Sequence, residues 1–293
     1  RELDLATSGY WIDRPYATGV NSFDFDATMF DDPQGMIDTA HDLGFRMALW
    51  HAPYVASDQV PELAAEAEER GFYPDTQSHL VDRWGLPIDF TNPEAVAWWQ
   101  DNLRNYMDMG IEGFKLDYAE DVITGFGQTR LPWSFADGTD ELIQQSQYQR
   151  HYHRTYAELL PEDGGFLLCR AGTYGSQVHA SVIWPGDLDA TLKRHKEPAE
   201  DDGVTYNATG GLPASVALAL SLGATGFPLY GSDTGGYRHA PPDRETFIRW
   251  FQQTSVSTVM QVGTNTNDVP WETAAEWLRK GQLVIMSSWR YRE

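Results

Sequence analysis

One pattern repeats along the chain and constrains its fold more than any other feature: a capped amphipathic helix, a glycine, and then a short apolar strand. In the first instance Asp31 or Asp32 is the predicted N-cap and Pro33 the first helical residue, and apolar residues follow at helical spacing. Gly44 ends this helix, and a strand over residues 45–50 follows at once. The same pattern predicts further helices over residues 95–109, 141–160, 213–222, 244–255 and 272–280.

The pattern yields eight candidate strands, which cover residues 9–13, 45–50, 113–117, 166–170, 182–184, 226–230, 258–262 and 283–287. Strands that mostly alternate with helices imply a parallel sheet with both faces covered. This number favours an α/β fold of the closed (β/α)8 TIM-barrel type over an open doubly wound sheet, and no Gly-rich dinucleotide or phosphate fingerprint follows any strand. Two longer insertions, residues 57–89 and 124–140, are expected to form loops or short helices over the barrel mouth.

The composition fits one catalytic domain over residues 1–293, because 41 % of the residues are hydrophobic and a barrel of this length is common. The formal charge of −22 repels phosphate backbones and anionic lipids, so neither nucleic acid nor a membrane is an expected partner. The sequence shows no transmembrane-length apolar run, signal peptide or disulfide pair, which favours a soluble, cytoplasmic protein. The chain begins without an initiator Met, as a processed piece does, so its compartment stays open.

Active sites of such barrels lie at the carboxyl ends of the strands. The residues predicted there are rich in acids, cations and aromatic rings: Asp13, Trp50, His51, Lys115, Asp117, Glu120, Arg170, Trp184, Asp187 and Asp233. Carboxylates hydrogen-bond hydroxyl groups, while indole faces cover the C–H surface of a sugar. The set therefore predicts a pocket for a neutral polyhydroxylated ligand.

Each of these residues also has a purely structural interpretation. Asp117 could cap the following segment, and Asp187 and Asp233 stand in turn sequences. An unpaired ammonium within a strand is costly, so Lys115 is expected to have a carboxylate partner under either interpretation. His51 fits a packed rim residue as well as a ligand contact. The functional prediction therefore depends on the joint placement of these residues.

The sequence predicts neither a metal nor an organic cofactor. His151 and His153 are two residues apart on a predicted helix and so do not share a face, and no Cys and His spacing matches a zinc site. Cys169 precedes Arg170 within a strand, points to the opposite face, and is predicted to lie in the core.

Five motifs in order, between Asp13 and Asp233, resemble segments of glycoside hydrolase family 31, the retaining α-glycosidases. GFKLDYAED resembles the nucleophile segment, which implies that Asp117 is the nucleophile. RAGTYGSQ followed by WPGD resembles the segment with a sugar-binding arginine, Arg170, and the acid/base aspartate, Asp187. The resemblance implies hydrolysis by double displacement, with Asp117 ionised and Asp187 initially protonated.

The other motifs imply a substrate-binding set. WIDRPY resembles the segment whose aspartate, here Asp13, holds sugar hydroxyls, and RWGLPIDFTNPEAVAWW places the pocket tryptophan at Trp84. YGSDTGGY resembles the SDIGG-type segment at Asp233, and Lys115 matches a lysine of the xylosidase-like branch. The predicted substrate-binding residues are thus Asp13, His51, Trp84, Lys115, Arg170, Trp184 and Asp233.

Two departures from the family pattern bear on the substrate. The segment MQVGTNTND has Gly263 or Thr264 where the family usually has a sugar-contacting histidine, and His51 stands where many members have a carboxylate. A small residue leaves room for a substituent on the sugar, so α-glucosides, α-xylosides, α-galactosides and α-N-acetylgalactosaminides all stay open as substrates.

The order of the motifs is also unusual. By resemblance the chain starts at the family's second strand, whereas its tail, VIMSSWRYRE, resembles the first. In a closed barrel the place after the eighth strand adjoins the second, so we expect a circularly permuted or engineered barrel in which residues 283–287 pair with the strand ending at Asp13. The functional alternatives are a transglycosylase on the same site, a non-catalytic carbohydrate-binding barrel, and an inactive engineered barrel.

Overall fold

The computed structural model describes residues 8–76, 84–123, 131–161 and 165–262. The chain divides into two compact units, Arg1–Ser181 and Val182–Glu293, each of which is described by itself. The predicted helix over residues 272–280, the predicted strand over residues 283–287 with its proposed permuted pairing, and Gly263 and Thr264 all lie outside the described residues.

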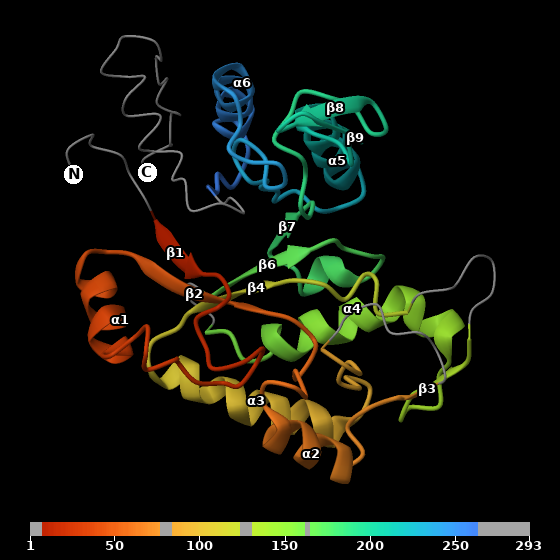
Figure 1. Ribbon diagram of the computed structural model, residues 1–293. Helices are drawn as coiled ribbons and strands as arrows, with labels where there is room; N and C mark the ends of the chain where they lie inside the picture. Colours follow the sequence, from red (N-terminus) through yellow and green to blue (C-terminus); the bar gives the residue numbers. More distant parts are fainter. Residues whose placement is uncertain (1–7, 77–83, 124–130, 162–164, 263–293) are drawn as a thin grey trace. The chain divides into compact units, whose positions relative to one another are not determined.

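The first unit is built on a parallel sheet. Its strands are β1 (Gly9–Ile12), β2 (Arg46–His51), β4 (Gly113–Leu116) and β6 (Phe166–Arg170), in the order β1-β2-β4-β6 (Figure 1). In register, Trp50 of β2 lies opposite Lys115 of β4, which in turn lies opposite Leu168 of β6. All four predicted strands are present to within one residue, and parallel pairing places their carboxyl ends at one edge of the sheet.

Capped helices connect these strands. Helix α1 (Pro33–Asp42) has Asp32 as its N-cap, with the carboxylate accepting from the Gly35 N–H at 2.9 Å. Helices α3 (Pro93–Asp108) and α4 (Glu141–Ala157) begin after Asn92 and Asp140, whose side chains also accept backbone N–H groups. The insertions hold helix α2 (Pro61–Glu69) and a small antiparallel pair, β3 (Asp75–Thr76) with β5 (Trp133–Ser134), and a short turn of 3-10 helix, η1 (Ser176–Val178), follows β6.

An aromatic core lies between the sheet and helices α3 and α4, which run on the same side of the four strands (Figure 1). Trp99 of α3 donates its indole N–H to the Tyr156 hydroxyl of α4 at 2.9 Å, and Phe114 of β4 packs against the Tyr156 ring. These side chains are fully buried. Burial of large aromatic rings dominates the packing energy here, because each removes about 150–250 Å² from water.

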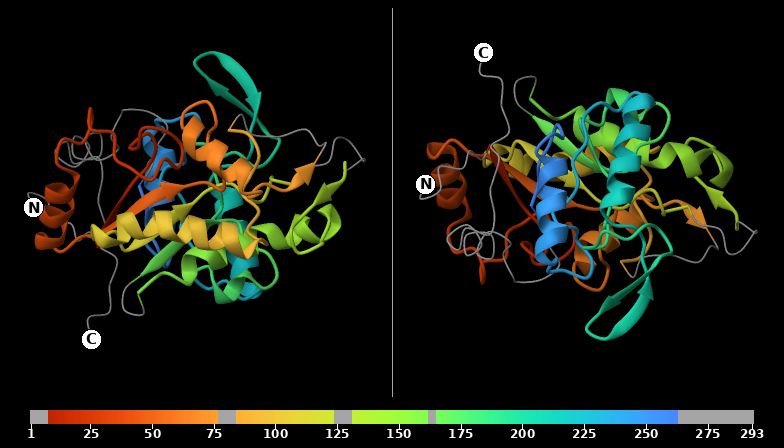
Figure 2. Two further views of the ribbon diagram at one scale, coloured as in Figure 1. Left: turned by 90° about the horizontal axis from the view of Figure 1, so that it is seen from below. Right: turned by 90° about the horizontal axis from the view of Figure 1, so that it is seen from above.

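The second unit contains β7 (Val182–Trp184), α5 (Leu212–Ala224) and α6 (Arg244–Thr254), together with an antiparallel hairpin of β8 (Pro198–Asp201) and β9 (Val204–Asn207). Figure 2 shows α5 and α6 side by side and the hairpin projecting beyond them. The predicted strand over residues 226–230 is reduced to one parallel bridge, Ile183 to Tyr230, because Pro228 cannot donate to a ladder. The strand over residues 258–262 is likewise reduced to a bridge at Gln261.

Among the residues that the structure describes, no helix has the length and apolar character needed to cross a lipid bilayer.

Candidate active site

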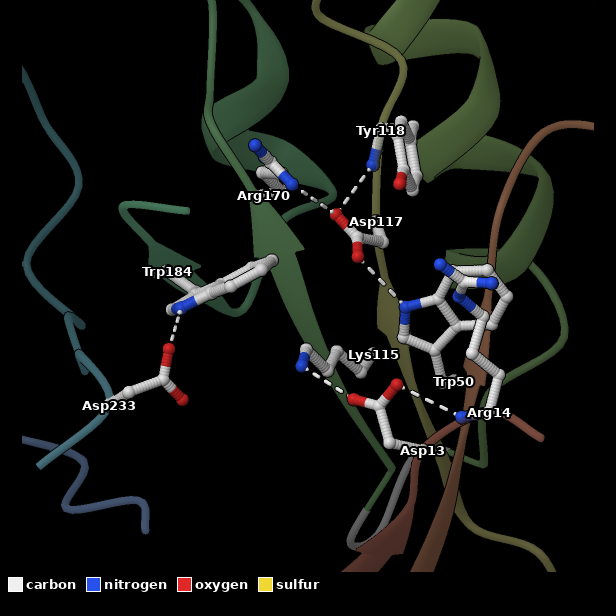
Figure 3. Close-up of polar contacts among 9 residues, drawn as sticks. All are labelled: Asp13, Arg14, Trp50, Lys115, Asp117, Tyr118, Arg170, Trp184 and Asp233. Atoms are coloured by element: carbon white, nitrogen blue, oxygen red, sulfur yellow. Dashed lines mark hydrogen bonds and ion pairs between the residues drawn. The ribbon is translucent and has the colours of Figure 1, made fainter. Parts of the chain in front are cut away.

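Asp117 follows β4 at the carboxyl edge of the first unit's sheet, and three N–H groups hold its carboxylate. Oδ2 accepts from Trp50 Nε1 at 2.9 Å, and Oδ1 accepts from Arg170 Nη1 at 2.9 Å and from the Tyr118 backbone N–H at 2.8 Å (Figure 3). The side chain is 11 % exposed. Donors from three directions fix the orientation of this carboxylate and suit an anion.

Lys115 lies two residues before Asp117, so the period of the strand places both on the same face. Its ammonium is 2.7 Å from Asp13 Oδ2, and its side chain is only 5 % exposed (Figure 3). The other oxygen of Asp13 accepts the Arg14 backbone N–H at 2.9 Å. The carboxylate partner expected for Lys115 is therefore Asp13, which binds it from the end of β1.

Aromatic rings line this group of charges. The rings of Trp50 and Trp84 meet edge to face with centroids 5.9 Å apart, and Trp84 and Tyr118 do so at 5.0 Å. The Arg14 guanidinium lies over both indoles, at 5.4 Å from the Trp50 centroid and 4.9 Å from that of Trp84. Contacts of this kind attract a cation to the ring face. Trp50 thus contacts Asp117 directly, and Trp84 packs against Trp50 and Tyr118, which both donate to that carboxylate.

Arg170, at the end of β6, binds two carboxylates at once. Besides Asp117, it contacts Glu120, whose Oε1 lies 2.6 Å from Arg170 Nε. Between Asp117 and Glu120 the chain turns through Tyr118 and Ala119, which both adopt left-handed backbone conformations, with φ of 60° and 83°. Such conformations cost about 1–2 kcal/mol per non-glycine residue, so the tertiary structure must hold this turn in place.

The sequence places Glu120 among the residues at the predicted pocket but gives it no catalytic or substrate-binding role. A glutamate next to another acidic residue, here Asp121, carries no distinguishing signal. In the structure, the pKa of Glu120 is raised to about 7, chiefly by desolvation and to a smaller degree by the charges of Asp121 and Asp117, while the Arg170 charge acts in the opposite direction. Its side chain remains 31 % exposed.

His51 does not join this group of residues. It neighbours Trp50 on β2, and because adjacent strand residues point to opposite faces, its ring lies in the aromatic core. Its Nδ1 is 2.8 Å from the Tyr156 hydroxyl, and the rings of Phe23, Tyr106 and Phe114 surround it. Complete burial lowers the pKa of His51 to about 3.

In the second unit, two predicted site residues contact each other: Trp184, at the end of β7, donates its indole N–H to Asp233 Oδ2 at 2.9 Å (Figure 3). Both side chains are buried. Asp187 follows three residues after Trp184, beyond Gly186, whose φ of 84° turns the chain, and it is partly buried.

A group of three or more His, Cys, Asp or Glu side chains that could hold a metal ion does not occur in the described part of the chain.

The parallel sheet, with helices between its strands and acidic residues at its carboxyl edge, is an α/β arrangement with a carboxylate-rich site. Residues 1–291 match the family model described as the glycosyl hydrolases family 31 TIM-barrel domain, so the chain belongs to glycosyl hydrolase family 31. The predicted family and the predicted (β/α)8 fold class are confirmed.

Several relatives of the chain are named glycosidases. The chain is 29 % identical over 263 residues to an α-xylosidase of Emericella nidulans, covering 85 % of this chain and 30 % of the relative. It is 29 % identical over 232 residues to a sulfoquinovosidase of Escherichia coli, covering 74 % and 31 %. The chain therefore spans about a third of the length of these curated relatives.

Solved structures share the fold. A family 31 α-xylosidase from a soil metagenome, complexed with xylose, matches with a TM-score of 0.70 and 22 % identity, over 88 % of this chain and 37 % of that one. A sulfoquinovosidase from E. rectale in complex with an aza-sugar inhibitor matches with a TM-score of 0.68 and 24 % identity, over 85 % and 37 %.

Proposed function

We propose that this domain hydrolyses α-linked glycosides with retention of anomeric configuration, and that Asp117 is its nucleophile. The observation that carries the proposal is the fixed carboxylate of Asp117, at the carboxyl end of β4, with Trp50, Arg170 and the Tyr118 N–H as donors. A nucleophile must meet the anomeric carbon along a set line, so a carboxylate whose orientation is already fixed lowers the entropic cost of attack. The family's named glycosidases support the reaction class.

Asp187 is proposed as the acid/base residue. It protonates the leaving oxygen in the first step and then removes a proton from water in the second. Replacing it with alanine is expected to slow substrates with poor leaving groups far more than 4-nitrophenyl glycosides, whose leaving group needs little protonation. Steady-state rates on both substrate types check this, and equal losses would remove Asp187 from the acid role.

The remaining residues are proposed to bind the sugar. Asp13, held by Lys115, accepts hydrogen bonds from sugar hydroxyls, and Arg170 donates to them. Trp84 is proposed to line the sugar site of the first unit beside Trp50, and Trp184 and Asp233 act together as a bonded pair in the second. Neutral hydroxyl groups need both acceptors and donors, which this set supplies. His51 is left out, because its ring lies on the opposite face of β2 from Trp50 and contacts Tyr156 in the core.

The decisive test is a panel of 4-nitrophenyl α-glycosides of glucose, xylose, galactose and N-acetylgalactosamine, with the product anomer identified by NMR at early times. We expect cleavage of at least one member with release of the α-anomer. Release of the β-anomer would contradict the retaining mechanism. Tight binding of a sugar without any cleavage would instead favour a carbohydrate-binding barrel.

Transglycosylation on the same residues is the second candidate, because an isomaltosyltransferase of Sporosarcina globispora is 25 % identical to the chain over 282 residues. In that reaction an acceptor sugar replaces water in attacking the glycosyl-enzyme intermediate. Products formed at high acceptor concentration separate the two: a hydrolase releases mainly free sugar, and a transglycosylase mainly a longer glycoside.

A further inference from the structure

A second carboxylate binds the same guanidinium as the proposed nucleophile. Arg170 contacts Asp117 through Nη1 at 2.9 Å and Glu120 through Nε at 2.6 Å, so two nitrogens of its guanidinium bind carboxylates. A guanidinium has a rigid, planar set of donors, and fixing one edge fixes the direction of the other. Glu120 therefore determines where the Nη1 hydrogen bond to Asp117 points.

The backbone supports the same interpretation. Tyr118 and Ala119 have left-handed backbone conformations directly after Asp117, and after this turn the Glu120 carboxylate contacts Arg170. The Tyr118 ring also lies under the Arg170 guanidinium, at 5.5 Å from its centroid. The guanidinium is thus held by an acid at its Nε edge and a ring at its face, while Nη1 holds the Asp117 carboxylate.

We propose that Glu120 is a positioning residue of the active site, which acts through Arg170 to hold the Asp117 carboxylate in the orientation for attack. The inference rests on the proposed role of Asp117 as nucleophile. The ionised form of Glu120 performs this role, because a neutral carboxyl binds a guanidinium more weakly. The charged groups that face Glu120 are Arg170 on β6 and Asp117 and Asp121 on its own segment.

The titration of Glu120 gives the proposal a specific signature. Its pKa is raised to about 7, so the positioning carboxylate is ionised at pH 8.5 and protonated at pH 5.5. The Glu120→Gln variant resembles the protonated form at every pH. The ratio of kcat between the parent protein and Glu120→Gln is therefore expected to be roughly ten- to one-hundredfold at pH 8.5 and to approach one at pH 5.5.

Glu112→Gln is the matched control. Glu112 precedes the same strand at its opposite end, is 29 % exposed against 31 % for Glu120, and is likewise paired with an arginine, Arg46, at 3.3 Å. The ratio of kcat between the parent protein and Glu112→Gln is expected to stay near one at both pH values. Glu120→Asp keeps the charge on a shorter side chain, and we expect its kcat to exceed that of Glu120→Gln at pH 8.5 but not at pH 5.5.

The outcomes separate this inference from the proposed function. A ratio for Glu120→Gln that is the same at both pH values, or no loss at all, overturns the positioning role while hydrolysis and the role of Asp117 stand. Should Glu120→Gln fail to fold, as judged by its thermal unfolding, the comparison of Glu120→Asp with the parent protein at the two pH values decides the question. If the parent protein cleaves no member of the glycoside panel, the proposed function itself is overturned, and the positioning role with it.

Discussion

At the scale of single residues, the position of a residue along its strand determines whether its side chain reaches the candidate site or the core. Trp50 and His51 are neighbours on β2, yet one donates to Asp117 and the other contacts Tyr156 in the core. On β4, Lys115 and Asp117 share a face and both reach the candidate site. Residue type alone marked all four as candidates, and only the alternation of the strand separates the core residue from the others.

The proposed nucleophile gives the first prediction. Asp117→Asn keeps the size of the side chain but removes the attacking charge, so we expect kcat to fall by roughly 10⁴-fold or more. The thermal unfolding midpoint should change little by comparison. Asp38→Asn, an exposed change on α1, is the control and should keep full activity. Hydrolysis of the best panel substrate measures the effect, and substantial residual turnover in Asp117→Asn would exclude the residue as nucleophile.

The buried His51 gives a prediction about stability. Its pKa of about 3 in the folded protein, against about 6.5 when unfolded, means that the unfolded chain binds the extra proton between these values. The contribution of neutral His51 to the free energy of unfolding is fully present above pH 6.5. It is lost as the pH falls toward 3, at up to about 1.4 kcal/mol per pH unit. Urea unfolding at several pH values should therefore show a shallower pH dependence in His51→Gln than in the parent protein. An unchanged slope would place the titration elsewhere, and a changed KM with unchanged stability would restore His51 as a ligand contact.

At the scale of elements, the sequence predicts the regular parts of the fold and misses the local additions. Helix ends follow from glycines: Gly44 and Gly110 both have positive φ, 83° and 103°, directly after the predicted helices. The hairpin β8–β9 was not predicted, because its strands carry polar residues and neither face is covered as a barrel strand is. The role proposed for Glu120 was not predicted for a related reason: it depends on the positive φ of Tyr118 and Ala119, which no residue type indicates.

The start of α1 gives a prediction with its own control. The sequence leaves Asp31 and Asp32 as alternative N-caps, and the structure selects Asp32, which accepts the Gly35 N–H at 2.9 Å. Asp32→Ala is expected to lower the free energy of unfolding by about 1 kcal/mol. Asp31→Ala, one residue away and exposed, should change it by less than about 0.5 kcal/mol. Urea titrations of the two variants measure the difference, and equal effects would mean that the cap hydrogen bond contributes nothing.

At the scale of the whole molecule, the family match covers nearly the entire chain, whereas the packing of the described residues divides it at Ser181. The prediction of a single domain over residues 1–293 can therefore be tested by asking whether the chain unfolds in one cooperative transition. A barrel whose strands all belong to one sheet is expected to unfold as one unit, because opening any strand removes hydrogen bonds from its neighbours. Two separate domains would instead unfold in two transitions.

Cys169 can report on this question, because it is the single cysteine of the chain and lies in the first unit. It is fully buried on β6, opposite Leu116 of β4, and burial raises the pKa of its thiol, so a thiol reagent reaches no thiolate until the sheet opens. For a single cooperative domain, the urea midpoint of thiol labelling should coincide with the midpoint followed by far-UV circular dichroism, which averages over both units. If thiol labelling is complete at a urea concentration where a distinct part of the circular dichroism transition still remains, the first unit unfolds independently. The chain would then have to be treated as two domains.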